Sequence, residues 1–171
     1  MADITKVSSA EDIQQVAALA HEIWTNHYVP IVGQEQVDYM LEMFQSSSAI
    51  SAQIENGYDY YLVFDGGGVA GYFALVPSPR DSTLLLSKIY IRSDFRGKGL
   101  GKAVIEFAEK QCAALGLRTL WLTVNKRNVN SIAFYNSLGF SKESSIVNDI
   151  GKGFVMDDFK MVKRVSFNAR A

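Results

Sequence analysis

The segment from Thr83 to Lys102, TLLLSKIYIRSDFRGKGLGK, carries the strongest structural signal of this 171-residue chain. Its first part, Thr83–Ile91, is nearly continuously apolar, which is typical of a strand buried on both faces. A glycine-rich turn follows. From Leu100 to Leu115 apolar residues then recur at the spacing of one helical face, and Gly116 has the position of a C-terminal cap. The segment therefore predicts a buried strand that passes through a glycine-rich turn into a long helix.

The glycine-rich turn has the features of an anion site. Backbone amides at the start of a helix lack intrahelical acceptors, and glycines let the main chain come close to a bound group. The helix dipole and the cations Arg96, Lys98 and Lys102 add positive charge. We expect a pyrophosphate here. The alternative is a turn with a purely structural role.

Two common phosphate motifs do not fit these residues. A Walker A motif would need glycine at Arg96 and Ser or Thr at Ala103. The dinucleotide fingerprint would need its third glycine at Lys102 or at Val104, depending on where it starts. A nucleoside triphosphatase and a dinucleotide-binding enzyme are thereby disfavoured.

The turn instead resembles the acetyl-coenzyme A signature of the GNAT superfamily, Gln/Arg-x-x-Gly-x-Gly/Ala. Arg96, Gly99 and Gly101 fill its three positions. In that family one more helix and one more strand lead to a short helix that begins at an asparagine, carries a tyrosine and ends in Gly-Phe. The matching residues here are Asn128, Tyr135, Gly139 and Phe140, with Ser131 where the family more often has alanine. The specific resemblance covers about Thr83 to Phe140.

This resemblance implies a fold, a reaction and a catalytic residue. The fold class is α/β of the α+β type, with a central, mixed but mostly antiparallel sheet flanked by helices. The reaction is direct acetyl transfer from acetyl-coenzyme A to a primary amine. Tyr135 corresponds to the general acid that protonates the departing thiolate; its alternative role is that of a packing aromatic.

The resemblance also implies the cofactor-binding residues. The main chain of Ile89, Tyr90 and Ile91 is expected beside the pantetheine arm. The expected pyrophosphate cradle comprises Arg96, Gly97, Lys98, Gly99, Leu100, Gly101 and Lys102. Asn125, Asn128 and Asn130 are candidates for hydrogen bonds to the amide arm, and the residues leave the choice among them open.

The acceptor side is less constrained by the sequence. Trp24, Tyr28 and the C-terminal stretch resemble the PaiA-like branch of the family, whose members acetylate spermidine and spermine. The substrate-binding candidates are Trp24, Tyr28, Glu35 and Asp157. A solvated helix face is the alternative for Glu35, and Asp157 with Asp158 could instead mark a bulge or an edge strand. A protein N-terminus or lysine, another small amine, and a non-catalytic coenzyme A-binding module stay open as alternatives to a polyamine acetyltransferase.

The remaining pattern predicts one domain over 1–171, with a frayed tail at 166–171. Strands are expected at Asp3–Val7, Tyr58–Asp65, Val69–Val76, Thr119–Val124, Phe140–Ser145 and Phe154–Val165. Helices are expected from a Ser8 or Ser9 cap to about His27, over Gln34–Gln45, after Ser46, and over Asn128–Leu138; Tyr28–Gly33 is expected as a break, so that two main helices precede the central sheet.

The net charge, the apolar runs and the counts of histidine and cysteine limit the classes of partner that we expect. A net charge of -1 argues against non-specific nucleic-acid binding. Apolar runs fall short of the roughly 18 residues that cross a bilayer, so we expect no membrane partner and a cytoplasmic location. Two histidines six residues apart and a single cysteine predict no metal site, and Cys112 is expected as a buried small hydrophobe. His27 is interpreted either as a base or as a surface or helix-terminal histidine, and a homodimer is a family expectation.

Overall fold

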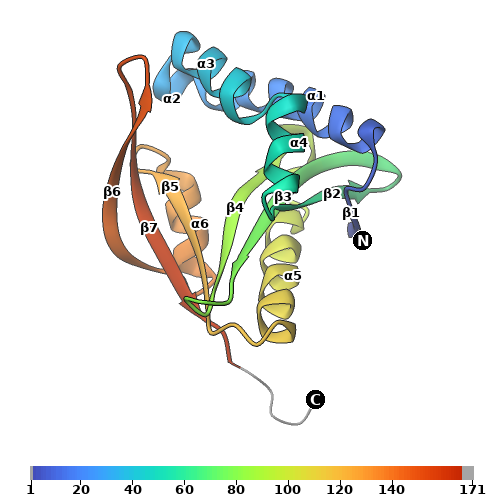
Figure 1. Ribbon diagram of the computed structural model, residues 1–171, viewed down its shortest axis with the longest axis vertical. Coiled ribbons are helices and arrows are strands. Elements are labelled where there is room, and N and C mark those ends of the chain that lie inside the picture. Colours follow the sequence, from blue (N-terminus) through green and yellow to red (C-terminus); the bar gives the residue numbers. More distant parts are fainter. Residues whose placement is uncertain (1, 167–171) are drawn as a thin grey trace. The chain divides into compact units, whose positions relative to one another are not determined.

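The structure is a computed structural model that describes residues 2–166; positions 167–171 of the expected tail lie outside the described residues. The elements follow one another as β1 (Ala2–Lys6), α1 (Ala10–His27), α2 (Val29–Val32), α3 (Gln34–Phe44), α4 (Ser47–Glu55), β2 (Asp59–Asp65), β3 (Gly68–Ser78), β4 (Thr83–Ile91), a 3₁₀ turn (Ser93–Phe95), α5 (Leu100–Ala114), β5 (Thr119–Asn125), α6 (Val129–Ser137), β6 (Ser141–Gly151) and β7 (Phe154–Arg164) (Figure 1). The strands form one sheet in the order β1-β2-β3-β4-β5-β7-β6. The predicted α/β class with a mixed, mostly antiparallel sheet is confirmed.

Helix α1 begins as its sequence predicts. The Ser9 hydroxyl accepts a hydrogen bond from the Asp12 amide at 3.1 Å, and the Asp12 carboxylate accepts one from the Ser9 amide at 3.3 Å. This reciprocal capping box satisfies donors that the first turn would otherwise leave unpaired. Val16, Ala20 and Trp24 are buried on one face. The cap therefore fixes the start of the helix that later presents Trp24 and His27.

One compact unit comprises residues 2–76 and 88–105. In it β2 pairs antiparallel with β1 and β3, and helices α1 to α4 contact one another. Its fully buried side chains include Val16, Ile50, Val63 and Phe73. We call it the N-terminal unit.

The other unit, here the C-terminal unit, comprises residues 77–87 and 106–166. The first residues of β4 pair in parallel with β5, which pairs antiparallel with β7, and β7 with β6. Leu84, Ala108, Leu120 and Leu122 contribute to its core. Both β4 and α5 run through the boundary between the units, so the glycine-rich turn that joins them belongs to the N-terminal unit.

Several local expectations need correction. Strand β4 is not buried on both faces: Leu84, Leu86 and Lys88 are buried, whereas the alternating side chains are only half-buried. The period-2 pleat separates these two sets, which a nearly continuous apolar run conceals. Helix α5 ends at Ala114, and Leu115, expected on its apolar face, is exposed.

The N-terminal helices also differ from the expectation. Four helical segments, not two main ones, precede β2. The expected break at Tyr28–Gly33 contains the four-residue helix α2. Pro30 is compatible with this helix because it lies in the first turn, where the backbone amide that proline lacks would have no partner within the helix.

The edge or bulge interpretation of Asp157 and Asp158 is wrong. Strand β7 pairs on both sides, with β5 and with β6. The register irregularities are in β6, at Lys142/Ser144 and Asp149/Gly151. Two adjacent carboxylates therefore lie on an interior strand of the C-terminal unit's sheet.

The single cysteine is confirmed as a buried small side chain. Cys112 is fully buried in α5, and its Sγ donates to the Leu117 carbonyl at 3.4 Å. Burial, with a smaller effect of the nearby Glu109, raises the pKa of the thiol to about 11. The thiolate that a nucleophile requires is thereby disfavoured.

Candidate active site

The glycine-rich turn has the predicted strand–turn–helix geometry. Gly97 and Gly99 adopt φ angles of +78° and +77°, which L side chains rarely adopt. The Ala103 amide donates to the Gly99 carbonyl at 3.0 Å as the first bond of α5. The amides of Leu100, Gly101 and Lys102 precede that bond, so they have no acceptor within the helix. This is the arrangement of an anion cradle.

The cations of the turn have different surroundings. Lys98 lies over the Phe95 ring at 5.1 Å, and its exposed ammonium is 3.7 Å from the half-buried Asp65 carboxylate, a long ion pair. Arg92 forms ion pairs with Glu22 and Asp94, each at 3.3 Å. Arg96 is exposed. Arg92 is thus neutralised by two carboxylates, whereas Arg96 can meet a bound anion.

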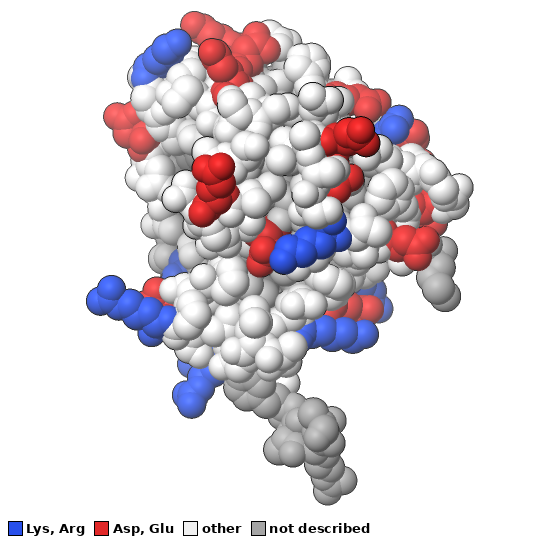
Figure 2. Space-filling model, turned by 45° about the vertical axis from the view of Figure 1, so that its right-hand side comes forward, with Lys and Arg blue, Asp and Glu red and all other residues white. Residues whose placement is uncertain are grey.

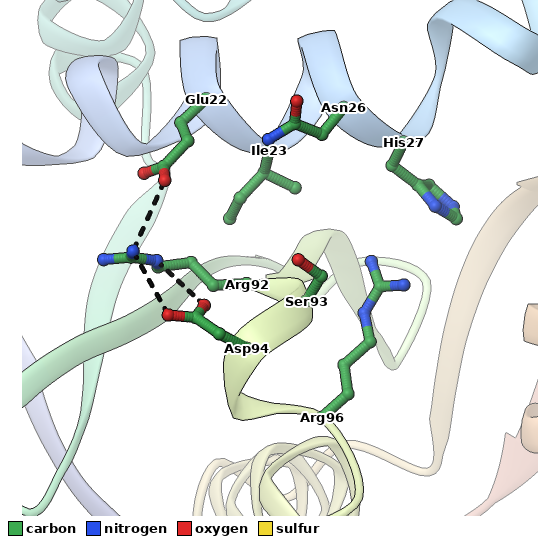
Figure 3. Close-up of a pocket in the computed structure, with 8 residues that line it drawn as sticks. All are labelled: Glu22, Ile23, Asn26, His27, Arg92, Ser93, Asp94 and Arg96. Carbon is green, nitrogen blue, oxygen red and sulfur yellow. Dashed lines mark hydrogen bonds and ion pairs between the residues drawn. The ribbon is translucent and has the colours of Figure 1, made fainter.

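A small cavity of about 150 Å³ lies between α1 and the turn. Figure 3 shows Arg92 directed toward Glu22 and Asp94, and Arg96 extending toward α1 near His27. Burial first, and the Arg96 charge second, lower the pKa of His27. His27 is the last residue of α1, so the helix-terminal position is confirmed, and it is half-buried; its neutral form is favoured near pH 7.

Strand β3 fixes the main chain of Ile89–Ile91. A Cβ added to Gly71 would lie 2.3 Å from the Tyr90 carbonyl oxygen and 2.8 Å from Ile91 Cδ1. The Arg92 amide donates to the Ala70 carbonyl at 2.8 Å. The strand expected beside the pantetheine arm is therefore held by an approach that only glycine permits.

An aromatic cluster, which we define as Trp24, Tyr28, Tyr72 and Tyr90, joins α1 to this strand. The Trp24 and Tyr28 ring centroids are 4.4 Å apart, and Tyr90 lies 5.2 Å from Trp24 and 5.9 Å from Tyr28. Trp24 Nε1 donates to the Tyr72 hydroxyl at 3.3 Å, which donates to Gln45 at 3.0 Å. The structure thus brings together the expected acceptor residues Trp24 and Tyr28. The side chains of Tyr72 and Tyr90 are members that sequence reasoning missed.

A buried lysine was also missed. Lys88 Nζ donates to the Phe44 carbonyl at 2.8 Å, to Gln53 Oε1 at 2.9 Å and to the Tyr60 hydroxyl, which itself donates to Gln53. Burial lowers the pKa of Lys88 to about 7. All three protons of the ammonium have acceptors, so Lys88 ties α3 and α4 to β2 and β4. Its only signal in the sequence is a cation within an apolar strand.

We expect Lys88→Met to destabilise the protein by about 1–3 kcal/mol, because it leaves buried oxygen acceptors without their donor. The unfolded chain binds more protons than the native protein between the native pKa of about 7 and the usual value of 10.5. The free energy of unfolding of the wild type should therefore rise with pH across that window. The difference in unfolding free energy between wild type and Lys88→Met should grow over the same window. Urea unfolding at pH 7 and pH 9 measures both effects.

Lys110→Met, at an exposed lysine of α5, is the control and should change stability by less than about 0.5 kcal/mol. A Lys88→Met variant as stable as wild type at both pH values would contradict the prediction.

The remaining expected site residues belong to the C-terminal unit. Asn125 and Asn128 share one turn, in which the Asn128 amide donates to the Asn125 carbonyl at 2.9 Å. The Asn125 side-chain oxygen accepts from the Arg127 amide, Asn128 is buried, and Asn130 is exposed. Tyr135 is 7% exposed and packs against Phe134 and Phe140, at ring distances of 5.5 and 5.8 Å.

The two carboxylates expected at the acceptor site lie in different units. Glu35 is exposed in the first turn of α3, in the N-terminal unit. Asp157 pairs with Lys126 at 2.6 Å in the C-terminal unit. Within residues 2–166 no group of three or more His, Cys, Asp and Glu side chains could hold a metal ion. Helices of a length and apolar character that would cross a membrane are not found in that range either.

Comparison with known proteins decides the family. The sequence profile of the Acetyltransferase (GNAT) family matches residues 16–140, which include most of α1, the glycine-rich turn and α6. This chain belongs to the GNAT family. GNAT enzymes take the acetyl group from acetyl-coenzyme A, so the protein is a GNAT N-acetyltransferase with acetyl-coenzyme A as its co-substrate.

Curated GNAT relatives act on different acceptors. The chain is 28% identical over 150 residues to an uncharacterized N-acetyltransferase of Lactobacillus delbrueckii subsp. lactis, covering 84% of this chain and 87% of that protein. It is 34% identical over 92 residues to the [ribosomal protein bS18]-alanine N-acetyltransferase of Escherichia coli K12, covering 54% and 60%. It is 23% identical over 154 residues to the spermidine N(1)-acetyltransferase of Thermoplasma acidophilum, covering 87% and 92%.

Solved structures show the same GNAT fold. The PaiA N-acetyltransferase of Thermoplasma acidophilum in complex with coenzyme A has a TM-score of 0.77 at 22% identity, over 96% of this chain and 99% of that one. The ribosomal-protein-S18-alanine N-acetyltransferase of Escherichia coli has a TM-score of 0.69 at 22% identity, over 98% and 96%. At these identities the two likenesses show a shared fold.

Proposed function

We propose that this GNAT enzyme transfers the acetyl group of acetyl-coenzyme A directly to a primary amine of a polyamine such as spermidine or spermine. The aromatic cluster is the observation that carries the proposal. It joins Trp24 and Tyr28 to Tyr90, within the strand expected beside the thioester. Aromatic faces attract ammonium groups by about 0.5–2 kcal/mol. The relative named as a spermidine acetyltransferase supports the same class of acceptor.

The glycine-rich turn fits the donor's pyrophosphate. Gly97 and Gly99 carry no Cβ atoms and can adopt the positive φ angles of the turn, and Arg96 and Lys102 supply charge beside the first amides of α5. The main chain of Ile89–Ile91 would lie beside the pantetheine arm. Among the three asparagines, exposed Asn130 is most accessible to a ligand, while Asn125 and Asn128 order the turn that precedes α6.

The proposed chemistry needs no covalent intermediate with the enzyme. Bound acetyl-coenzyme A supplies the activated acetyl group as a thioester. The amine nitrogen forms a bond to the acetyl carbon, and the carbon–sulfur bond breaks. Tyr135 would donate its hydroxyl proton to the departing sulfur and recover a proton from solvent. We further propose that residues 1–171 form one acetyltransferase domain, since the family match includes parts of both units.

Thiol release from acetyl-coenzyme A tests the proposal. We expect kcat/KM for spermidine and spermine to exceed that for free lysine, an aminoglycoside and an alanine-leading peptide by roughly tenfold, a difference of about 1.4 kcal/mol. Mass spectrometry of the acetylated amine confirms transfer, and a reaction without amine gives the rate of hydrolysis. A preference for the peptide would instead support a protein acceptor, for which the bS18-alanine relative argues.

A coenzyme A-binding module without turnover would bind the donor in calorimetry but release no thiol with any amine. The cytoplasmic location and the homodimer stay predictions, as does the absence of a nucleic-acid partner. On the described part of the face shown in Figure 2, Lys and Arg side chains lie in small groups among acidic and uncharged ones, which favours a small-molecule acceptor over nucleic acid.

A further inference from the structure

Asp158 is a carboxylate in the interior of the C-terminal unit's sheet. It is 4% exposed, and its strand β7 lies between β5 and β6. In the backbone register it faces Asn125 on one side and Ile146 on the other. A buried carboxyl costs stability unless it has compensating partners. Its position therefore calls for a reason other than packing.

The face to which Asp158 belongs follows from the register. Lys163, on the same strand, donates to the Leu138 carbonyl at the end of α6, so α6 covers the face of Lys163. The β5–β7 register is continuous from Thr119 to Asn125. Asp158 is five residues from Lys163, which places it on the opposite face, together with Thr123 and Asn125.

The cations near Asp158 each pair with another carboxylate. Lys126 pairs with Asp157 at 2.6 Å, and Lys160, on the face of Asp158, pairs with Glu143 at 3.3 Å. Burial and then Asp157 raise the pKa of Asp158 to about 6, whereas Lys126 and a hydrogen bond from Thr123 lower it. From β6 the residue opposite is the uncharged Ile146. Asp158 is thus ionised at neutral pH and basic enough to take a proton.

We propose that Asp158 is the catalytic base that accepts a proton from the acceptor's ammonium group. The inference rests on the proposed function. Asp158 lies opposite Asn125, at the end of β5 where the cofactor's amide arm is expected, and on the face opposite α6, which carries Tyr135. Base and acid on opposite faces match a transfer in which the amine approaches the acetyl carbon from one side and the thiolate leaves from another.

The proton balance closes without a further reactant. The ammonium gives one proton to the Asp158 carboxylate, directly or through one water, and becomes the nucleophilic amine. Its nitrogen bonds to the acetyl carbon as the carbon–sulfur bond breaks, and the sulfur takes a proton from Tyr135. Of the two protons that the nitrogen still carries, one stays in the amide product and the other restores Tyr135 through solvent. The proton on Asp158 then leaves to solvent, so the net products are acetylamine, thiol and one proton.

The dependence of kcat/KM for spermidine on pH tests the role. In the wild type we expect kcat/KM to fall about tenfold per pH unit below about pH 6, the native pKa. Asp158→Asn should lower kcat/KM at pH 7.5 by roughly 10²-fold and abolish this acid limb. Asp157→Asn should raise KM at most and keep the acid limb, which should move to lower pH because the Asp157 charge raises the pKa of Asp158. Asp149 is exposed on the neighbouring strand, and Asp149→Asn should leave both kcat/KM and the acid limb unchanged.

A second variant keeps the test valid even if Asp158→Asn does not fold. Thr123→Val removes the hydrogen bond that lowers the pKa of Asp158, so the acid limb should move to higher pH while the carboxylate remains. If the acid limb does not move in Thr123→Val, or if it is retained in folded Asp158→Asn, the inference about Asp158 is overturned and the proposed function is not. Failure of the wild type to acetylate any amine overturns the proposed function, and the inference falls with it.

Discussion

Tyr135→Phe is expected to lower kcat for thiol release by roughly 10²–10⁴-fold, the range that a positioned general acid contributes. The substitution removes only the hydroxyl proton donor. A phenylalanine ring at this position can make the same ring contacts with Phe134 and Phe140, at 5.5 and 5.8 Å. The departing thiolate would then have to take its proton from water. Steady-state kinetics at saturating acetyl-coenzyme A measure the loss.

The same variant separates catalysis from folding. Its thermal midpoint and its calorimetric affinity for coenzyme A should match those of the wild type. Tyr58→Phe removes a hydroxyl from β2's N-terminal flank, in the other unit, and should retain full activity. If Tyr135→Phe keeps kcat within about twofold, well below the 10²-fold minimum of acid catalysis, Tyr135 is only a packing aromatic.

Gly71→Ala is expected to lower the free energy of unfolding by more than about 3 kcal/mol, because the new methyl group would meet backbone that cannot move independently. The added Cβ would lie 2.3 Å from the Tyr90 carbonyl oxygen and 3.1 Å from Ile91 Cα. For a chain of this length that corresponds to a thermal midpoint roughly 10 °C lower. Differential scanning calorimetry measures the shift.

Gly68→Ala is the matched control on the same strand. The tightest contact of its Cβ would be with the end of the Phe95 ring, at 3.2 Å, and this side chain can shift by a few tenths of an ångström; the Asp65 carbonyl oxygen would lie at an ordinary contact distance of 3.6 Å. We expect a loss of less than about 1 kcal/mol. Equal midpoints for the two variants would contradict the steric argument. If Gly71→Ala folds, it should also bind coenzyme A more weakly, since the Ile89–Ile91 main chain would be displaced.

Features that depend on local sequence were predictable. The Ser9 capping box, the positive φ of Gly97 and Gly99, and the start of α5 at Leu100 each follow from chemistry within a few residues. The β4–turn–α5 segment also resembled a known family, so its anion cradle could be proposed from the sequence. The profile match over residues 16–140 confirms that family.

Features that depend on tertiary packing were not predictable. Lys88 obtains its acceptors from residues 28, 35 and 44 positions away in the chain. Asp158 and Asp157 are adjacent in sequence, yet one is buried and the other pairs with Lys126, because strand alternation directs them to opposite faces. The run of apolar residues in β4 gave no indication of which side chains face the core.

The burial of Cys112 has a practical consequence for assays. Thiol-specific chromogenic reagents react with thiolates that they can reach, and the chain's single sulfhydryl is fully buried with its pKa raised to about 11. The native enzyme should therefore contribute almost no background to a continuous colorimetric assay of released coenzyme A. Conversely, a sudden gain of one reactive equivalent per chain would report that α5 has opened, so the same reagent can follow unfolding without an added label.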